Sequence, residues 1–146
     1  MNPHAILRVI SKFLVPFIAL FAFYVQFHGD VGPGGGFQAG VILAASVILY
    51  ALIFGLEAAK KAVPPAMVRI LMTIGVLLYG GTGVVTWFLG DEFLNYGALN
   101  HHDPAHGQHW GILAVELGVL VTVTSVMVAI FYAFGSRAPE ISDEDW

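Results

Sequence analysis

The chain has 146 residues, of which 58% are hydrophobic and only 11% are charged, and its formal net charge is −4 at pH 7. Because soluble domains carry about 25% charged residues, this composition excludes an ordinary soluble domain and indicates an integral membrane protein. The absence of cysteine excludes a disulfide framework and thiolate metal sites, and an acidic chain without a basic patch is not expected to bind nucleic acid.

Four apolar segments each approach the roughly 20 residues that a helix needs to cross a bilayer. They cover residues 9–27, 37–56, 70–89 and 111–134. Helices are favoured over strands, because backbone polar groups cannot stay unpaired in lipid and four segments cannot close a barrel. The expected fold is therefore an all-α integral membrane protein with four transmembrane helices in a single domain, residues 1–146, ending in an acidic tail at 138–146.

The basic residues all fall on one side of this arrangement of four helices. They are Arg8 and Lys12 near the first segment, Lys60, Lys61 and Arg69 between the second and third, and Arg137 after the fourth. Since cytoplasmic loops carry an excess of Lys and Arg, we expect both termini and the middle loop to be cytoplasmic. The other two loops are then on the outer side, where acidic residues and histidines gather.

The first outer loop is a glycine-rich stretch, HGDVGPGGGFQAG, at residues 28–40. It lacks the Gly-Lys-Ser/Thr ending of a nucleotide-binding loop and follows no strand, so phosphate binding is not expected. One interpretation is a tight hairpin in which residues 33–36 supply the turn torsions. The other is a broken-helix element in which Asp30 contributes charge to an ion path. The pattern favours the hairpin.

Small residues recur on two of the predicted helices, where they indicate packing surfaces. They are Gly36, Gly40 and Ala44 at intervals of four residues on the second helix, and Gly80, Gly81 and Gly83 on the third. Small side chains let a neighbouring helix approach closely. Because four short helices enclose little interior, we expect much of their surface to meet other subunits.

Glu116 is the only clear ionisable residue inside a predicted span. It lies six residues beyond Trp110, roughly 9 Å along a helix at 1.5 Å per residue. Intramembrane carboxyl groups are costly and often mark ion or proton paths, so Glu116 is a candidate relay for a proton or cation. The alternative is a packing role, in which Glu116 accepts hydrogen bonds from neighbouring side chains or stays protonated.

The second outer loop contains four histidines, His101, His102, His106 and His109, together with Asp103. Neutral imidazole is a common zinc ligand, but the spacing fits no defined zinc motif. A solvated histidine-rich loop is the favoured interpretation, so no metal site is expected here. Zinc binding by these four histidines is the weaker alternative, and sensing of external pH is another.

Three stretches resemble the B subunit of the multisubunit Mrp-type (Mnh) cation/proton antiporters: GDVGPGGGFQAG, TWFLGDEF and ILAVELGVL. In the first stretch, the positions that match the family pattern are Gly29, Pro33, Gly34, Gly35, Gly36 and Phe37. Asp30 stands where the family often has histidine, and Ala39 replaces the first of a later glycine pair. An acidic residue of the family falls on Glu116.

The resemblance implies an accessory subunit, and not an enzyme, of an assembly that exchanges Na⁺ or a similar cation for H⁺ without a cofactor. It further implies a bacterial or archaeal cell membrane and larger partner subunits related to those of respiratory complex I. Related subunits of membrane-bound hydrogenases leave a redox-driven ion pump as an alternative host. Two other hypotheses are a stand-alone small channel or transporter and a metal sensor built on the histidine loop.

Overall fold

The computed structural model describes residues 5–29, 32–100 and 102–137, and all secondary structure in these ranges is helical. The elements are α1 (Ala5–Phe27), α2 (Gly36–Phe54), α3 (Leu56–Ala62), α4 (Pro65–Phe88), the 3-10 helix η1 (Tyr96–Leu99) and α5 (Pro104–Gly135). Four of them, α1, α2, α4 and α5, are long and apolar enough to cross a membrane. The prediction of an all-helical fold with four helices able to span a membrane is confirmed.

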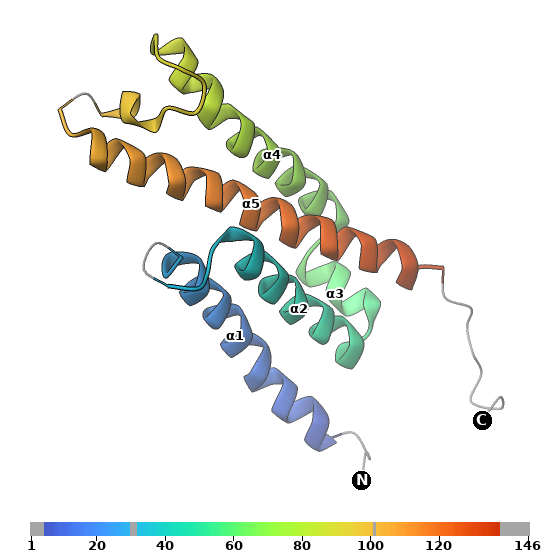
Figure 1. The fold of residues 1–146 in the computed structure, drawn as a ribbon. Coiled ribbons are helices and arrows are strands. Elements are labelled where there is room, and N and C mark those ends of the chain that lie inside the picture. The colour runs from blue at the N-terminus through green and yellow to red at the C-terminus, as the bar shows by residue number, and fades with distance from the viewer. Residues whose placement is uncertain (1–4, 30–31, 101, 138–146) are drawn as a thin grey trace.

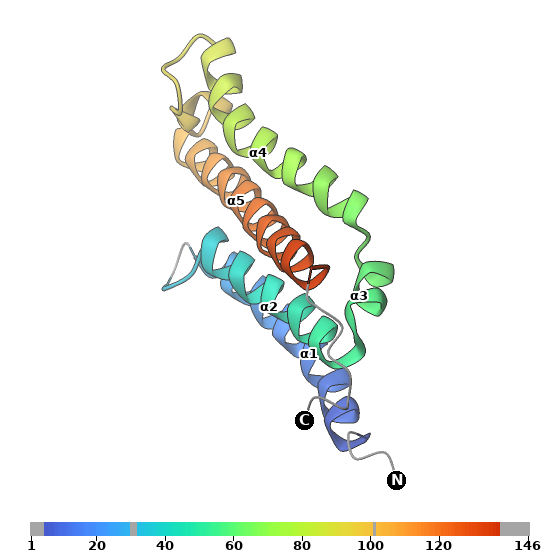
Figure 2. The ribbon, with the colours of Figure 1, turned by 90° about the vertical axis from the view of Figure 1, so that its right-hand side faces the viewer.

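The four long helices form a row and not a closed bundle. α1 packs on α2, α2 packs on α5, and α5 packs on α4. Figures 1 and 2 show α4 on the far side of α5 from the α1–α2 pair. The inner members of the row, α2 and α5, therefore form the centre of the molecule, where Ala44, Val128 and Tyr132 belong to one buried cluster.

Helix α1, at one end of the row, leaves most of its apolar side chains uncovered. In the most hydrophobic part of α1 only 11% of the residues are buried within the chain, against 28% in α2. Such exposure is unfavourable in water, but lipid tails or other helices can cover an apolar helix face inside a membrane. The single row of helices is thus consistent with a membrane protein.

The connection between α2 and α4 is more structured than hydropathy predicts. α2 ends at Phe54, two residues before the predicted limit of 56, and Gly55 with φ +94° separates it from the short helix α3. α4 begins at Pro65, five residues before the predicted start at 70. Proline is favoured in the first turn of a helix, where its missing N–H has no partner to lose. Apolar content alone does not reveal these polar and proline-containing turns.

The last helix begins earlier than predicted, at Pro104 instead of residue 111. The side chain of Asp103 caps it by accepting hydrogen bonds from the backbone N–H groups of Ala105, at 3.1 Å, and His106, at 3.2 Å. An aspartate at this position satisfies donors that would otherwise be unpaired. His106 and His109 therefore lie on the first turns of α5, and not in an irregular loop.

Candidate functional site

The glycine loop between α1 and α2 lies against α5 at Glu116. The loop joins the end of α1 at Phe27 to the start of α2 at Gly36, and Figure 1 shows it beside α5. Glu116 is the thirteenth residue of the 32-residue helix that begins at Pro104. The tip of the α1–α2 hairpin therefore lies alongside α5 and not beyond its end.

Two glycines make this close approach possible. A methyl group added at Gly36 would overlap the backbone carbonyl oxygen of Glu116, so a larger residue would separate α2 from α5. Gly35 has φ +126°, a conformation that residues with a side chain rarely adopt. A methyl group at Gly35 would also lie 3.2 Å from Oε1 of Glu116. The glycine run thus determines how close the loop comes to the carboxyl group.

The other residues of the predicted loop core pack on the end of α1 or lie at the surface. A methyl group added at Gly34 would lie 2.6 Å from the carbonyl oxygen of Val25, at the end of α1. Pro33 and Phe37 are exposed. Asp30, the second predicted ion-path residue, lies outside the described residues. Within the described part of the loop, the backbone approaches Glu116, while the two larger side chains point away from the interior.

Gln26 in the last turn of α1 is a polar neighbour of Glu116. Its side-chain Nε2 donates a hydrogen bond to Oε2 of Glu116 over 3.5 Å, which is long for such a bond. Gln26 is only 1% exposed, although glutamine is mostly a surface residue. Its other polar atom, Oε1, is buried and has no hydrogen-bond partner. Sequence analysis missed Gln26, because an uncharged amide in an apolar helix matches no motif.

Apolar packing begins directly beside this polar pair. Val25, Ala39 and Leu120 form a buried cluster contributed by α1, α2 and α5. The N-terminus of α2, with Gly35 as its N-cap, lies beside the carboxyl group, and helix N-termini carry partial positive charge. The site therefore combines a carboxyl group, an amide and a helix N-terminus next to a water-excluding cluster.

The small residues predicted to pack helices divide into two groups. Gly40 lies against α5, where an added methyl group would be 2.8 Å from Cβ of Val123, and Ala44 is fully buried. A methyl group at Gly83 would be 2.6 Å from the ring of Phe93. At Gly80 and Gly81, by contrast, it would meet no described atom within 4 Å. The small residues of α2 therefore serve contacts inside the chain, and these two glycines of α4 do not.

The described histidines between α4 and Trp110, namely His102, His106 and His109, are exposed. The rings of His106 and His109 have centroids 6.4 Å apart, and both lie near the ring of Trp110. Among residues 5–29, 32–100 and 102–137, no three His, Asp or Glu side chains are placed to hold one metal ion. His101 lies outside these ranges, so the four-histidine hypothesis is not tested as a whole.

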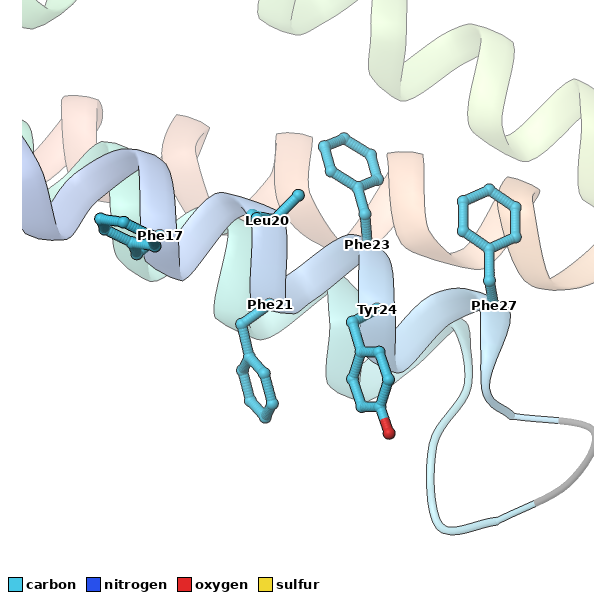
Figure 3. Close-up of a pocket in the computed structure, with 6 residues that line it drawn as sticks. All are labelled: Phe17, Leu20, Phe21, Phe23, Tyr24 and Phe27. Atoms are coloured by element: carbon cyan, nitrogen blue, oxygen red, sulfur yellow. The ribbon is translucent and has the colours of Figure 1, made fainter.

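An apolar hollow of about 580 Å³ runs along α1 and is lined by Phe17, Leu20, Phe21, Phe23, Tyr24 and Phe27. Figure 3 shows that Phe23 and Phe27 project from one side of α1, whereas Phe21 and Tyr24 project from the opposite side. The only polar group in this lining is the Tyr24 hydroxyl. The hollow is therefore a surface for apolar contact and offers no carboxyl or amide ligand to an ion.

Comparison with known proteins finds one family and close similarity over nearly the whole chain. The family model described as "Domain related to MnhB subunit of Na+/H+ antiporter" matches residues 6–129. Proteins of Staphylococcus aureus strains Newman, JH1 and Mu3, each named "Putative antiporter subunit mnhB2", are 36% identical to this chain over 136 residues. The matched region covers 91% of this chain and 96% of each relative. The family match includes both the glycine loop and Glu116.

Proposed function

This chain belongs to the MnhB family of Na⁺/H⁺ antiporter subunits, and on that premise we propose that Glu116 is an acidic station on the ion path of the antiporter. The protein is a subunit of a multisubunit Na⁺/H⁺ antiporter and thus part of a transporter, not an enzyme. The other subunits of that complex are its partners. This identity favours the antiporter over a redox-driven pump or a stand-alone channel.

The observation that carries the proposal is the contact between the glycine loop, Gln26 and the carboxyl group of Glu116. A carboxyl group used only for packing is expected to sit among fully satisfied polar neighbours. Here the buried neighbour Gln26 has one atom 3.5 Å from the carboxyl group and the other without a partner. This arrangement suits a group whose bound proton or ion changes during function.

The surroundings also explain why an ion would be needed. An isolated charge beside an apolar cluster is unfavourable, so an ionised Glu116 requires compensation by a nearby positive group. The partial positive charge at the start of α2 contributes to this compensation. Binding of H⁺ or Na⁺ would neutralise the carboxylate directly, and we propose that the two ions compete for it.

The proposal includes larger partner subunits related to those of respiratory complex I. A single row of helices has no enclosed interior in which a continuous aqueous path could run, so neighbouring subunits must complete the path. The uncovered apolar face of α1 (Figure 3) offers area for such contacts. No cofactor is required, because the transported species are themselves the ions that titrate or bind Glu116.

We further propose a multi-pass arrangement in a bacterial or archaeal cell membrane, with both termini cytoplasmic. In Figure 1 the start of α1, the short α3 and the end of α5 lie at one end of the long helices. The glycine loop lies toward the opposite end. Lys60 and Lys61 lie on α3, which fits the excess of basic residues on the cytoplasmic side.

Cysteine labelling tests this topology. An impermeant thiol reagent applied outside intact cells should label Gly32→Cys in the glycine loop and leave Ala62→Cys at the end of α3 unlabelled. Permeabilised cells should label both, which controls for accessibility. Labelling of the Ala62→Cys variant from outside would show that the orientation is the reverse of the proposed one.

Substitution of Glu116 tests the ion-path role. Glu116→Gln keeps the shape and hydrogen bonding of the side chain but cannot bind and release a proton, so Na⁺-dependent proton flux should be lost. Glu116→Asp should retain part of the flux. The measurement uses everted vesicles that contain the complete complex, with subunit content determined on the same membranes.

Glu57→Gln is the matched control, because the Glu57 side chain is 85% exposed and pairs with Lys60 at 3.1 Å. This variant should show normal flux. If Glu116→Gln assembles normally and transports as well as the unsubstituted complex, Glu116 has a packing role and the proposed ion-path role is wrong.

A further inference from the structure

We propose that Gln26 and Glu116 together bind a partly dehydrated monovalent cation of the size of Na⁺, with Gln26 Oε1 as the second side-chain ligand. The inference rests on the proposed function and goes beyond it by identifying the second side-chain ligand. Gln26 belongs to α1 and Glu116 to α5, 90 residues apart in sequence. The hairpin formed by α1 and α2 is what brings the two side chains together.

The unpartnered oxygen of Gln26 is the first observation behind this inference. Buried amide groups nearly always satisfy both their donors and their acceptor. Gln26 is 1% exposed, yet Oε1 has no hydrogen-bond partner, while Nε2 of the same amide is near Glu116. An apolar side chain of similar size would fill the space without burying an unsatisfied oxygen. A cation held between this oxygen and Glu116 would satisfy it once the amide has rotated, with Nε2 then in the present place of Oε1.

The amide can change which atom it presents to the carboxyl group. In the structure Nε2 donates to an oxygen of Glu116, which suits an ionised carboxylate without a bound cation. Rotation of the terminal amide exchanges Nε2 and Oε1, because the two ends have nearly the same shape. Oε1 then faces the carboxyl oxygen, and two such oxygens are compatible only with a proton or a cation between them. Ion binding and amide orientation are therefore linked.

The spacing of the two atoms fits a cation of a particular size. Oxygens about 3.5 Å apart, the present Nε2 to Oε2 distance, subtend close to a right angle at an ion held about 2.3–2.6 Å from each. That range of distances is typical of Ca²⁺, which has nearly the same radius as Na⁺. Mg²⁺, held at about 2.0–2.1 Å, would require the oxygens to move closer together. With one carboxylate as the charged ligand, a monovalent ion gives a neutral site.

The backbone of the glycine loop lies close to both oxygens of the carboxyl group. A methyl group added at Gly29 would lie 3.2 Å from Oε2 of Glu116, and one at Gly35 would lie 3.2 Å from Oε1. The methyl position at Gly35 is also 3.6 Å from Oε1 of Gln38, so glycine backbone and the Gln38 side chain border the carboxyl oxygens.

Protection against carbodiimide labelling tests the site in the complete complex. A carbodiimide modifies protonated buried carboxyl groups, so Na⁺ bound at Glu116 should slow its modification, measured by mass spectrometry of the peptide. In Gln26→Met the Na⁺ concentration for half-protection should rise by about 10- to 100-fold, the usual loss when a supporting ligand is removed. The Na⁺ concentration for half-maximal exchange should rise in parallel, at unchanged subunit content.

Two further variants make the result specific. Gln108→Met changes an exposed glutamine near the start of α5, whose Nε2 donates a hydrogen bond to Oδ1 of Asn95 at 3.4 Å, and should leave half-protection unchanged. Gln26→Glu keeps an oxygen ligand and adds negative charge, so it should lower the Na⁺ concentration for half-protection. This second variant decides the question if Gln26→Met fails to assemble, provided that protection by K⁺ is measured as well. Added charge alone would strengthen protection by Na⁺ and K⁺ alike, whereas a ligand oxygen at this spacing should strengthen protection by Na⁺ more. Equal strengthening for the two cations would overturn the cation site.

Unchanged half-protection in Gln26→Met, or no tightening in Gln26→Glu, would overturn the cation site. So would labelling of Glu116 that is indifferent to Na⁺. These outcomes leave the proposed role of Glu116 as a proton station intact, because that role is decided by exchange in Glu116→Gln. If both experiments fail, neither Glu116 nor Gln26 belongs to the ion path.

Discussion

Gly36 on α2 and Gly80 on α4 both belong to glycine clusters in apolar helices, but their surroundings differ. A methyl group at Gly36 would overlap the backbone of Glu116, whereas one at Gly80 would meet no described atom within 4 Å. The first glycine lets two helices of the same chain approach at a polar site. The second serves no contact within the described chain. A glycine cluster thus acquires a local function only where the fold brings another backbone to it.

The α1–α2 and α4–α5 connections show the same contrast. The α1–α2 connection contacts α5 through glycine backbone and leaves a buried amide oxygen unpartnered. The α4–α5 connection is held by ordinary caps: Thr86 Oγ1 accepts a hydrogen bond from the N–H of Leu94 at 3.0 Å, and Asp103 caps α5. We infer that the first connection is built around the candidate ion site and the second around helix termination.

The largest effect is expected for Gly36→Ala. The added methyl group meets a backbone carbonyl of α5, which cannot move away as a side chain can. Overpacking of this kind costs about 1–3 kcal/mol or more, and it would separate the glycine loop from Glu116. Both the amount of complex in the membrane and its Na⁺-dependent proton flux should fall.

Gly32→Ala is the matched control within the same loop. A methyl group there would lie 3.5 Å from the ring of His28, an ordinary contact, so assembly and flux should remain close to normal. Normal assembly and flux in Gly36→Ala would mean that the hairpin tip does not depend on close contact with α5, and the contrast between the two clusters would disappear.

The features accessible from sequence are those that depend on one segment at a time. The four spans follow from apolar length, Glu116 stands out as a charge among apolar neighbours, and the glycine run is visible as a composition change. Gln26 was not found, because its importance comes from a carboxyl group 90 residues away. The row arrangement of the helices was also inaccessible, since hydropathy does not tell which apolar face meets protein and which meets lipid.

The start of α5 was also predicted wrongly, but for a different reason. Asp103-Pro104 is a recognisable helix start, with an aspartate cap followed by proline. The prediction relied on apolar residues alone, and the polar histidine segment that follows Pro104 was therefore left out of the helix. The predicted start was too late for this reason. Local cap chemistry was therefore sufficient to find this boundary, whereas nothing local identifies the partner of Glu116.

A moderate effect is expected for Asp103→Ala, which removes the cap of α5. Loss of an aspartate cap costs about 0.5–2 kcal/mol, so amide hydrogen exchange in the first turn of α5 should become faster by about two- to thirtyfold. Asp103→Asn retains an oxygen acceptor and should exchange nearly as slowly as the unsubstituted protein. Exchange that is equally slow in Asp103→Ala would show that the second connection is held by contacts other than this cap.

The smallest effect is expected for Gly80→Ala. Alanine is favoured over glycine inside a helix by about 0.5–1 kcal/mol, and the added methyl group meets no described atom within 4 Å. The amount of this chain in the membrane, expressed without its partner subunits, should therefore stay the same or rise slightly. Gly75→Ala on the same helix is the control that should lower it, because a methyl group there would overlap Oγ1 of Thr122 on α5. A smaller amount of the Gly80→Ala chain in the membrane under these conditions would contradict the assignment of Gly80 to a surface without contacts in the chain. A fall seen only when the partner subunits are present would place another subunit against this face of α4.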